Sequence, residues 1–595
     1  MRRPSARLLL TVAFWLLLAA WTWLLILPNP IPEVVDAIPS GWRFIAAKCL
    51  HGGTYAVLAI MGWLWPAARR GRLAVAGLLL GHAVATEVIQ TYVPNREGCV
   101  RDVVIDWVGL GIGWTVVRFV VRNSLTGGGG SSDRLIGWAK ISGRAGLAGG
   151  GSRAKVALPP IPADVLPTVR SIRLMTLAPG HPDAARVQGR AVEGVHPRCH
   201  VYAPLGPDLL DHLGHLLASN ARPHDPTRWA ADVRAGDDWL DRALREQPGN
   251  AAVVTGPADQ KLDRLLACVR AGLHVLADEP WATCAADLPR LADLFHEADL
   301  RELVVWRLCP IRHDPAVQLL LELAADPDVC GELLPGTPDD PAVLLDATRH
   351  LRGTVEGRPV GRPAWAFGPA AGDALLAAGP LADLALRLVL PARPPDPALD
   401  LAGVDGTGWP GLLDRDQFAA VTGLADFPPE LASQVSRGTL AYRANGTATA
   451  TLGGVAVRLA VLAEVDPPAG GGDTLDAVVR GRRATLTARG GVGPGELTVE
   501  PATAAGPVYA ALGRRCQTLQ GRYPGLSVQD RGGRFRLATP AAGDGGYAAV
   551  LGEFVRYFRS PRQVPAWERA AAVTAAHLCV AASEAAKRKQ GVRGV

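Results

Sequence analysis

Cysteine is scarce in this sequence, and no pattern brings the cysteines together. The nine cysteines are scattered along 595 residues, without a Cys-x-x-Cys pair or a cysteine and histidine cluster at metal-ligand spacing. Runs of basic residues interleaved with aromatic side chains are also missing, although the net charge is +6. These absences argue against a metal site and against nucleic-acid binding, and they predict a reducing compartment.

Apolar residues are unevenly distributed along the chain. Hydrophobic residues make up 48% of the sequence, and the length exceeds what one core normally supports, so we expect several domains. The front end of the chain is far more apolar than the rest. Four stretches there approach the roughly 20 residues that a helix needs to cross a bilayer. They are residues 8–27, 49–66, 73–93 and 103–121.

These stretches predict a four-helix transmembrane domain over residues 1–125. A signal peptide is the alternative for the first stretch, but Pro28-Asn29-Pro30 follows it in place of a small-residue cleavage site. Arginines after the second and fourth stretches predict that both chain ends face the cytoplasm. We therefore expect a multi-pass protein of the bacterial inner membrane, with the lipid bilayer as partner and the later domains in the cytoplasm.

Polar side chains within and beside these apolar stretches are costly and therefore informative. In the predicted topology they gather near the outer leaflet. They are Lys48, His51, Tyr55, Glu87, Gln90, Arg96, Asp102 and Asp106. Two interpretations stay open: an outward-facing polar pocket, or side chains that pair with one another and hold four helices together.

The order of these polar residues resembles the VanZ-like family over about residues 8–121. The matching set is Lys48, His51, Tyr55, Glu87, Gln90, Pro94, Arg96, Asp102 and Gly109. The resemblance implies a helical membrane fold and an association with glycopeptide (teicoplanin) resistance, without a defined chemistry. One departure is Asp106, which stands where the family usually carries Asn and adds a potential charge.

Residues 126–168 have the composition of a linker. The segment 126–132 reads Thr-Gly-Gly-Gly-Gly-Ser-Ser, and Gly, Ala, Arg and Pro dominate the residues that follow. Such a composition is typical of a flexible tether. We expect the domains after it to move independently of the first 125 residues.

Residues 169–310 alternate strand and helix signals, which is typical of a parallel sheet with crossover helices. Predicted strands cover residues 171–177, 199–203, 251–255 and 273–277. Such a doubly wound, Rossmann-like domain binds ligands beyond the carboxyl ends of its strands. The expected crevice is therefore formed by Gly180, His181, Gly256, Pro257, Asp278 and Pro280.

The glycine fingerprint of dinucleotide-binding sheets is missing from this domain. Residues 178–183 read Ala-Pro-Gly-His-Pro-Asp after the first strand, in place of Gly-x-Gly-x-x-Gly. Phosphate contact through a helix N-terminus is still compatible with this sequence. His181 is left with two interpretations, a structural residue at a helix start or a ligand contact.

Residues 271–280, which end in Ala277-Asp-Glu-Pro280, resemble the Gfo/Idh/MocA oxidoreductases, whose corresponding strand ends in Glu-Lys-Pro or Asp-Lys-Pro. A bacterial oxidoreductase group with its own C-terminal domain is a closer match over about residues 171–580. Its motifs align with residues 177–188, 200–211, 220–229, 248–256, 336–341, 362–365, 472–474 and 565–568. The resemblance implies NAD or NADP as cofactor and a small sugar-like ligand, such as a sugar or cyclitol.

The chain departs from that family where the chemistry is expected. Glu279 replaces the lysine before Pro280, and Pro380 aligns with the usual acid/base histidine. A hydride-transfer site needs a group that exchanges the hydroxyl proton. The substitutes that the sequence offers are Asp373, Asp383 and His313.

Residues 311–595 are expected to form an α+β domain with an open, mainly antiparallel sheet. Residues 440–500 alternate apolar and polar side chains with the period of two that strands require. In the family that the chain resembles, this sheet often forms an oligomer interface, so a homo-oligomer is expected. The helix predicted over residues 566–589 ends in Lys587-Arg588-Lys589, which is either solvated or in contact with the anionic inner leaflet.

Three hypotheses about function remain open. The cytoplasmic part is a catalytically degenerate oxidoreductase that binds a ligand or serves as a scaffold, because the lysine and the histidine are replaced. Alternatively, it is an active NAD(P)-dependent sugar or cyclitol oxidoreductase that uses the substitute groups. In the third hypothesis the membrane part carries the function, in the cell envelope or in glycopeptide resistance.

Overall fold

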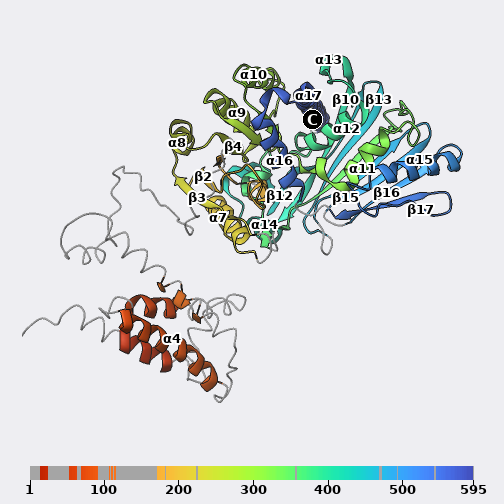
Figure 1. Ribbon diagram of the computed structural model, residues 1–595. Coiled ribbons are helices and arrows are strands. Elements are labelled where there is room, and N and C mark those ends of the chain that lie inside the picture. The colour runs from red at the N-terminus through yellow and green to blue at the C-terminus, as the bar shows by residue number, and fades with distance from the viewer. Residues whose placement is uncertain are drawn as a thin grey trace, which may run out of the picture. The chain divides into compact units, whose positions relative to one another are not determined.

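The computed structural model divides into two compact units, Met1–Gly149 and Gly150–Val595, and each is described by itself (Figure 1). In the first unit the structure describes residues 14–23, 53–62, 69–90, 106–107, 109–111 and 113–114. In the second it describes residues 171–180, 182–222, 226–355, 358–467, 472–491, 494–541 and 545–593. The predicted linker, residues 126–168, lies outside these ranges.

The described part of the first unit is helical. Residues 14–23 and 53–62 form helices, and α4 spans Arg69–Gln90. Phe14, Tyr55, Leu58, Leu79 and Ala83 form a buried cluster between them. The third predicted membrane span, residues 73–93, coincides with α4 over residues 73–90, and all four predicted spans extend beyond the described residues. Within the described ranges, no helix has both the length and the apolar character needed to cross a membrane.

The first sheet of the second unit has six parallel strands. They are β1 Leu174–Leu177, β2 Arg198–Ala203, β3 Ala230–Ala235, β4 Ala251–Val254, β5 His274–Ala277 and β6 Val305–Arg307. Their order is β3-β2-β1-β4-β5-β6, the doubly wound Rossmann order that residues 169–310 predicted. Every residue of β1 and β4 is buried, as expected for central strands with helices on both faces.

Helices cover both faces of this sheet. One face packs on α8 Trp239–Glu246, α9 Lys261–Arg270 and α10 Asp287–Leu300. The other packs on α7 Pro207–Asn220 and on α16 Gly545–Arg559, with the short α6 Pro182–Val187 beside them. Helix α16 comes from the end of the chain, so the parallel sheet is completed by residues far outside the range predicted for it.

The second sheet has ten strands and is mixed. Its path is β10-β12-β13-β7-β14-β15-β16-β18-β17, with β11 paired to β12, and the β7–β13 pair is parallel. The strands are β7 Val343–His350, β10 Leu401–Asp414, β11 Val435–Ser436, β12 Thr439–Leu452, β13 Val455–Glu464, β14 Thr474–Arg480, β15 Ala484–Gly491, β16 Pro494–Pro501, β17 Gln529–Asp530 and β18 Phe535–Ala541. In β12, half-buried and buried residues alternate along the whole strand, as the period of two predicted.

The remaining elements cover or edge this sheet. Helices α11 Pro315–Ala324, α12 Gly379–Val389 and α15 Ala505–Thr518 share one large hydrophobic core with its strands. Two short helices, α13 Pro397–Asp400 and α14 Arg415–Thr422, flank β10, and β8 Gly353–Val355 pairs with β9 Arg358–Val360. The 3-10 helices are η2 Ala258–Gln260, η3 Pro310–His313, η4 Ala364–Phe367, η5 Leu376–Ala378, η6 Pro429–Gln434 and η7 Pro561–Gln563.

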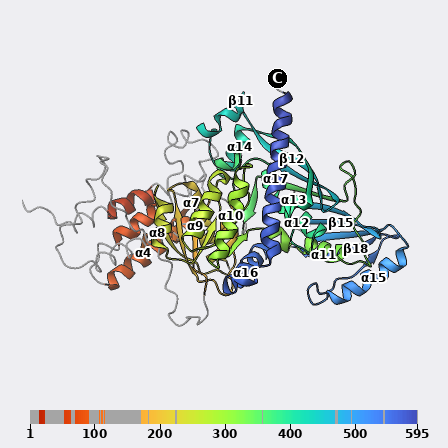
Figure 2. The ribbon, with the colours of Figure 1, turned by 90° about the horizontal axis from the view of Figure 1, so that it is seen from above.

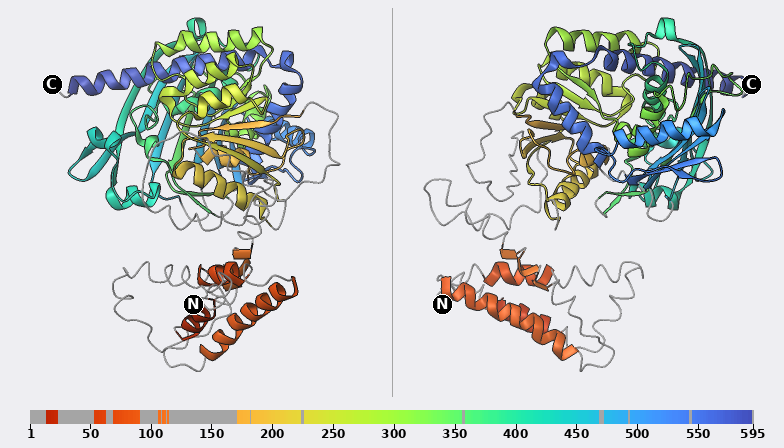
Figure 3. Two further views of the ribbon diagram at one scale, coloured as in Figure 1. Left: turned by 90° about the vertical axis from the view of Figure 1, so that its left-hand side faces the viewer. Right: turned by 45° about the vertical axis from the view of Figure 1, so that its right-hand side comes forward.

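The last helix, α17 Ala566–Arg593, joins the two sheets (Figure 2). Ala571, Ala575 and Leu578 belong to the core of the mixed sheet, whereas Ala572 and Val580 belong to the core of the parallel sheet. Small residues on several faces let one helix pack closely against both layers. Figure 3 shows α17 running along the mixed sheet from the parallel layer to the C-terminus.

Candidate functional site

A cavity lies between the carboxyl ends of the parallel strands and the inner side of the mixed sheet. The loops after β4 and β5 contribute Gly256, Ala258, Lys261, Asp278, Glu279 and Pro280. The mixed sheet contributes Arg349 from β7, Tyr442 and Ala444 from β12, and Val461 and Ala463 from β13. Further lining residues are Leu351, Arg362, Trp365, Ala366, Phe367, Ala371, Gly372, Asp373, Ala374 and Ala377.

The crevice predicted from the strand ends lies at this cavity. Gly256, Asp278 and Pro280 line it. Gly256 has a φ of +147°, and a Cβ there would lie 3.2 Å from the Arg264 Nη1 and 3.3 Å from the Ala178 carbonyl oxygen, so the loop after β4 requires glycine. Pro257 follows directly, as the residue that precedes η2. His181 lies outside the described residues.

Gly180 lies beside the cavity, at a second point where the backbone comes close to neighbouring side chains. A Cβ at Gly180 would lie 2.7 Å from the Asp208 Oδ2 and 2.9 Å from the Trp365 Nε1. The Trp365 indole donates a hydrogen bond to Asp208 (3.2 Å). Burial raises the pKa of Asp208, against the lowering effect of this hydrogen bond. Asp208 in the first turn of α7 therefore fixes the indole of Trp365 at the cavity wall, and Gly180 in the loop after β1 leaves room for both side chains.

Lys261 is a site residue that the sequence analysis missed. Its side chain is 1% exposed, and its Nζ lies 2.7 Å from the Asp278 Oδ1. A lysine buried at this depth requires a carboxylate partner. The local signal was a lysine at the start of α9, five residues after Gly256, but only the fold shows that it faces the end of β5.

Glu279 brings a carboxyl group to the cavity where the family has a lysine. Its side chain is 12% exposed, and its Oε1 lies 3.6 Å from the Arg307 Nη1. Its Oε2 has no hydrogen-bond partner among the described residues. Burial raises the pKa of Glu279, although Arg307 acts in the opposite direction. A Cβ at Gly379 would lie 2.5 Å from this Oε2, so only glycine lets the start of α12 approach the carboxyl group.

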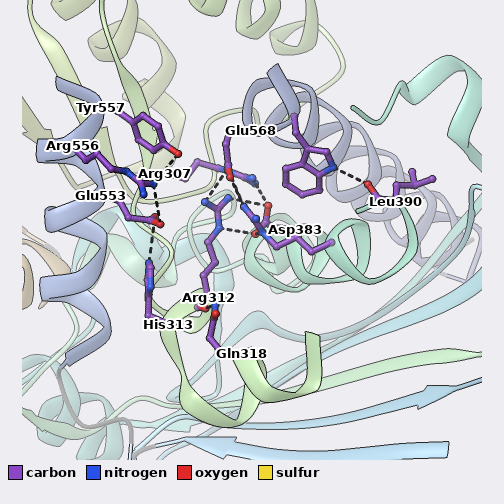
Figure 4. A network of polar contacts seen from close by, with 12 residues as sticks. Arg307, Arg312, His313, Gln318, Asp383, Leu390, Glu553, Arg556, Tyr557 and Glu568 are labelled. Carbon is purple, nitrogen blue, oxygen red and sulfur yellow. Dashed lines mark hydrogen bonds and ion pairs between the residues drawn. The ribbon is translucent and has the colours of Figure 1, made fainter. Parts of the chain in front are cut away.

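Asp383 lies in a buried arginine network (Figure 4). Arg312 bonds both of its oxygens, at 2.7 and 2.9 Å, and Arg387 bonds Oδ2 at 3.0 Å. Arg307 contacts Oδ1 as well. Although burial raises the pKa of Asp383, the three arginines hold it well below the usual range. The carboxylate is thus ionised and occupied on both oxygens.

Asp373 lines the cavity but is also engaged by neighbours. Its Oδ2 accepts from the Arg443 Nε (3.0 Å) and from the Ser583 Oγ (2.7 Å). Its Oδ1 accepts from the Leu375 amide at 3.0 Å. Lys587 of the basic C-terminal run lies 3.7 Å from Oδ2. The carboxylate therefore connects the cavity wall to α17.

His313 and Pro380 are not among the residues that line the cavity. His313 ends η3 and faces Glu553 of α16 at 3.4 Å (Figure 4). Pro380 is half-buried in the first turn of α12, next to Gly379. The structure thus brings Glu279, Asp373 and Asp278 to one cavity and leaves His313 outside it.

In the first unit the structure describes part of the predicted polar set. Tyr55 and Asp106 are buried, Glu87 and Gln90 belong to α4, and Lys48, His51, Arg96 and Asp102 lie outside the described residues. The Tyr55 hydroxyl lies 2.9 Å from the Nδ1 of His82, whose Nε2 lies 2.8 Å from the Thr22 Oγ1. His82 and Thr22 were not predicted as members of the polar set, although a histidine inside an apolar stretch is a usable signal.

Two family models match separate parts of the chain. The model "VanZ/LLP1" matches residues 14–121, and the model "Putative oxidoreductase C terminal domain" matches residues 319–587. No curated protein matches the chain.

Solved structures are similar to the second unit. The crystal structure of "a putative oxidoreductase from Parabacteroides merdae ATCC 43184" is 28% identical, with a TM-score of 0.66, over 71% of this chain and 98% of that chain. KijD10, a 3-ketoreductase from Actinomadura kijaniata in complex with TDP-benzene and NADP, is 16% identical, with a TM-score of 0.43, over 69% and 96%. GenD2 from gentamicin A biosynthesis, in complex with NAD, is 16% identical, with a TM-score of 0.45, over 75% and 98%.

The two matched regions together with the strand order account for most of the chain. Residues 14–121 match the VanZ/LLP1 model, and the six-stranded sheet precedes the region that matches the oxidoreductase C-terminal domain. The chain therefore combines a region similar to VanZ/LLP1 proteins with a region similar to oxidoreductases.

Proposed function

We propose that this chain is a membrane-anchored protein of the bacterial inner membrane whose cytoplasmic oxidoreductase-like domain binds ligands without hydride transfer. The proposal rests on the contacts of two candidate acids, Asp383 and Asp373, because neighbouring side chains already engage their oxygens. Both oxygens of Asp383 are taken by arginines, and Asp373 is held by Arg443 and Ser583. A general acid or base needs a free position toward the reacting hydroxyl.

The rest of the cavity supports the same conclusion. Glu279 stands in place of the family's lysine, and the described residues that line the cavity include no histidine. His313, the histidine that the sequence offered as a substitute, faces Glu553. Replacement of the family's lysine and histidine with retention of the fold is the pattern expected of a binding domain.

NAD or NADP is the ligand proposed for the parallel sheet. Its strand order creates a crevice at the carboxyl ends of the strands, where such sheets hold nucleotides. Gly256, with its positive φ, lies in the loop after β4 at this edge. Ala178, directly after β1, also has a positive φ, of +45°, in a loop where the usual fingerprint carries glycine. The backbone therefore keeps a left-handed turn although the glycine is missing.

The test uses the full chain purified in detergent. Titration with NADH and with NADPH should quench or shift the cofactor fluorescence, whereas incubation with sugars and cyclitols should leave the cofactor's redox state unchanged. Gly256→Val should abolish cofactor binding, because valine cannot adopt this φ without strain. Gly513→Ala, on the exposed side of α15 with open space around it, is the matched control. Absence of cofactor binding would refute the nucleotide proposal.

Turnover in the same assay would favour an active oxidoreductase. The observation that supports this second candidate is the Lys261–Asp278 pair, which places an ammonium group at the cavity. In that case Lys261→Met should remove turnover.

A VanZ-like role in the envelope is the third candidate, supported by the match over residues 14–121. It requires that Glu87→Ala abolish any glycopeptide-resistance phenotype of the intact chain.

We also propose that the chain forms a homo-oligomer through the mixed sheet. Trp409 and Leu412 on the edge strand β10 are 41% and 63% exposed. Light scattering of the detergent-purified chain measures the oligomeric state, and Trp409→Glu should reduce it to a monomer.

A further inference from the structure

The mixed sheet places an arginine beneath the cavity. Arg349 lies near the end of β7, on the side of the strand that carries the buried Val343 and Leu345. Its register partner on β13 is Ala463, and Ala444 of β12 lines the same cavity. Because these neighbours are small, the guanidinium has open space toward the loops of the parallel sheet.

Arg349 differs from the other cations of the site in its partners. Lys261 pairs with Asp278, and Arg443 pairs with Asp373. Among the described residues, no carboxylate lies within 4.0 Å of the Arg349 guanidinium. Its Nη2 donates instead to the carbonyl of Ala377 in η5, which fixes the side chain without neutralising its charge.

A second arginine lines the same cavity. Arg362 donates to the carbonyl of His350 at 3.3 Å, next in sequence to Arg349. Burial lowers the pKa of Arg349; Asp473 and, less strongly, Asp183 act in the opposite direction, whereas the charge of Arg362 adds to the lowering. Burial of the Arg349 guanidinium carries a cost that a bound anion would offset.

Aromatic side chains complete the wall above these arginines. Trp365 is oriented by its hydrogen bond to Asp208, and Phe367 and Tyr442 pack edge-to-face at 5.0 Å between ring centroids. Flat aromatic faces beside polar groups suit the apolar face of a sugar-like ring or chain.

We propose that this cavity binds a small polyhydroxy ligand that carries a carboxylate or a phosphate group, held by Arg349 and Arg362. The fork of a guanidinium group matches the geometry of both anions, whereas a neutral sugar would offer Arg349 no carboxylate or phosphate partner. The inference rests on the proposed binding role and adds the ligand class.

The experiment compares probes that differ only in charge, with the full chain in detergent and at constant ionic strength. D-gluconate is compared with D-glucitol, and glucose 6-phosphate with glucose, by isothermal titration calorimetry. Only the anionic member of each pair should bind. Inorganic phosphate is a further arm, because tighter binding of free phosphate than of the sugar phosphate would overturn the polyhydroxy part of the proposal.

Two variants test the arginine itself. Arg349→Met should weaken binding of the anionic probe by about 10- to 100-fold, the range for loss of a hydrogen bond to a charged group. Arg349→Lys should retain part of the affinity, because it keeps the charge and loses the fork. Arg352→Met is the control, since this arginine is 50% exposed and pairs with Asp466 at 2.8 Å. It should leave binding unchanged.

The outcomes separate this inference from the proposed function. Equal binding of charged and neutral probes, binding of neither, or unchanged affinity in a folded Arg349→Met would overturn the anionic ligand. NADH titration of the same samples reports on the nucleotide independently. If the wild-type protein binds NADH but does not prefer the anionic probes, the proposed function stands and only this inference is overturned.

Discussion

Two carboxyl groups flank Arg307, and the protein shifts their pKa values in opposite directions. Asp383 is enclosed by Arg307, Arg312 and Arg387, so its pKa falls despite burial. Among the described residues, Glu279 has one cation within ion-pair distance, Arg307 at 3.6 Å, and burial raises its pKa although Arg307 and, more weakly, Arg312 act in the opposite direction. The number of cations in contact with each group decides which effect is larger. One carboxyl is therefore a structural anion, and the other is the group that can gain a proton.

Asp383→Asn should strongly destabilise the protein. The change leaves the buried Arg307 and Arg312 and the partly exposed Arg387 short of negative charge, and breaking a buried ion pair costs about 3–5 kcal/mol. Urea unfolding of the full chain measures the loss. The control is Asp346→Asn, which breaks the half-exposed pair with Arg458 and should cost about 0–1 kcal/mol. Similar midpoints for the two variants would show that the network contributes little.

Glu279→Gln should change how stability depends on pH. Because the folded state raises the pKa of Glu279 above its ordinary 4.5, the folded protein keeps this proton while the unfolded chain loses it. Stability from this group therefore falls as pH rises above 4.5. The uncharged glutamine lacks this loss. The free energy of unfolding, measured at several pH values, should increase for the variant relative to the wild type as pH rises. Parallel pH dependences of the two proteins would contradict the shifted pKa.

At the scale of elements, the contact between α17 and β10 depends on one glycine. A Cβ at Gly406 of β10 would lie 2.0 Å from the carbonyl oxygen of Ala582 in α17. This distance is far inside van der Waals contact, so any side chain there must push the helix off the strand. Since α17 also packs on the parallel sheet, a shift at this point would reach both cores.

Gly406→Val should cost about 1–3 kcal/mol, the usual range for overpacking a close contact. Gly513→Ala in α15 is the matched control, because nothing lies within 4 Å of the added methyl group and alanine favours a helix by about 1 kcal/mol. Thermal unfolding of both variants should give shifts of opposite sign. An unchanged melting temperature in Gly406→Val would mean that the helix is not held against β10.

The regular elements could be predicted where local pattern decides them. The alternation along residues 440–452 predicted β12, and the buried apolar runs predicted β1, β2, β4 and β5. Strand β3 was missed, because it is an edge strand whose sequence Ala-Ala-Asp-Val-Arg-Ala is only partly buried and has a weak strand signal. The role of α16 in covering the parallel sheet could not be predicted, since hundreds of residues separate it from β1.

The site was predictable in part for the same reason. Strand ends placed Gly256, Asp278 and Pro280 at the crevice, because parallel strands share one carboxyl edge. Arg349 carries no local signal, and its importance comes from the mixed sheet that turns it toward the loops of the first sheet. Asp383 looked like a catalytic substitute until the fold brought three arginines around it.

At the scale of the whole molecule, the second unit has its own cores and its own site. The cores of the parallel and mixed sheets lie entirely within residues 172–586, and so do all residues that line the cavity. Of the residues that the structure describes, none of those that line the cavity belongs to the VanZ-like region. The second unit should therefore keep its ligand binding when it is separated from the first.

Cleavage between the units tests this independence together with the membrane proposal. A protease site inserted between Ser132 and Asp133 lies in the predicted tether, where insertions are best tolerated. Inverted inner-membrane vesicles that contain this variant should be cut by added protease, because the tether is proposed to be cytoplasmic. The larger fragment should then enter the supernatant and bind NADH as the full chain does, while the smaller fragment sediments with the lipid.

Two controls make the result decisive. The chain without the inserted site should stay in the pellet after the same treatment, and right-side-out vesicles should protect the inserted site. If the larger fragment remained in the pellet after cleavage, the second unit would itself be held at the membrane. Cleavage only in right-side-out vesicles would place the oxidoreductase-like domain outside the cytoplasm, away from the nicotinamide nucleotide proposed as its ligand.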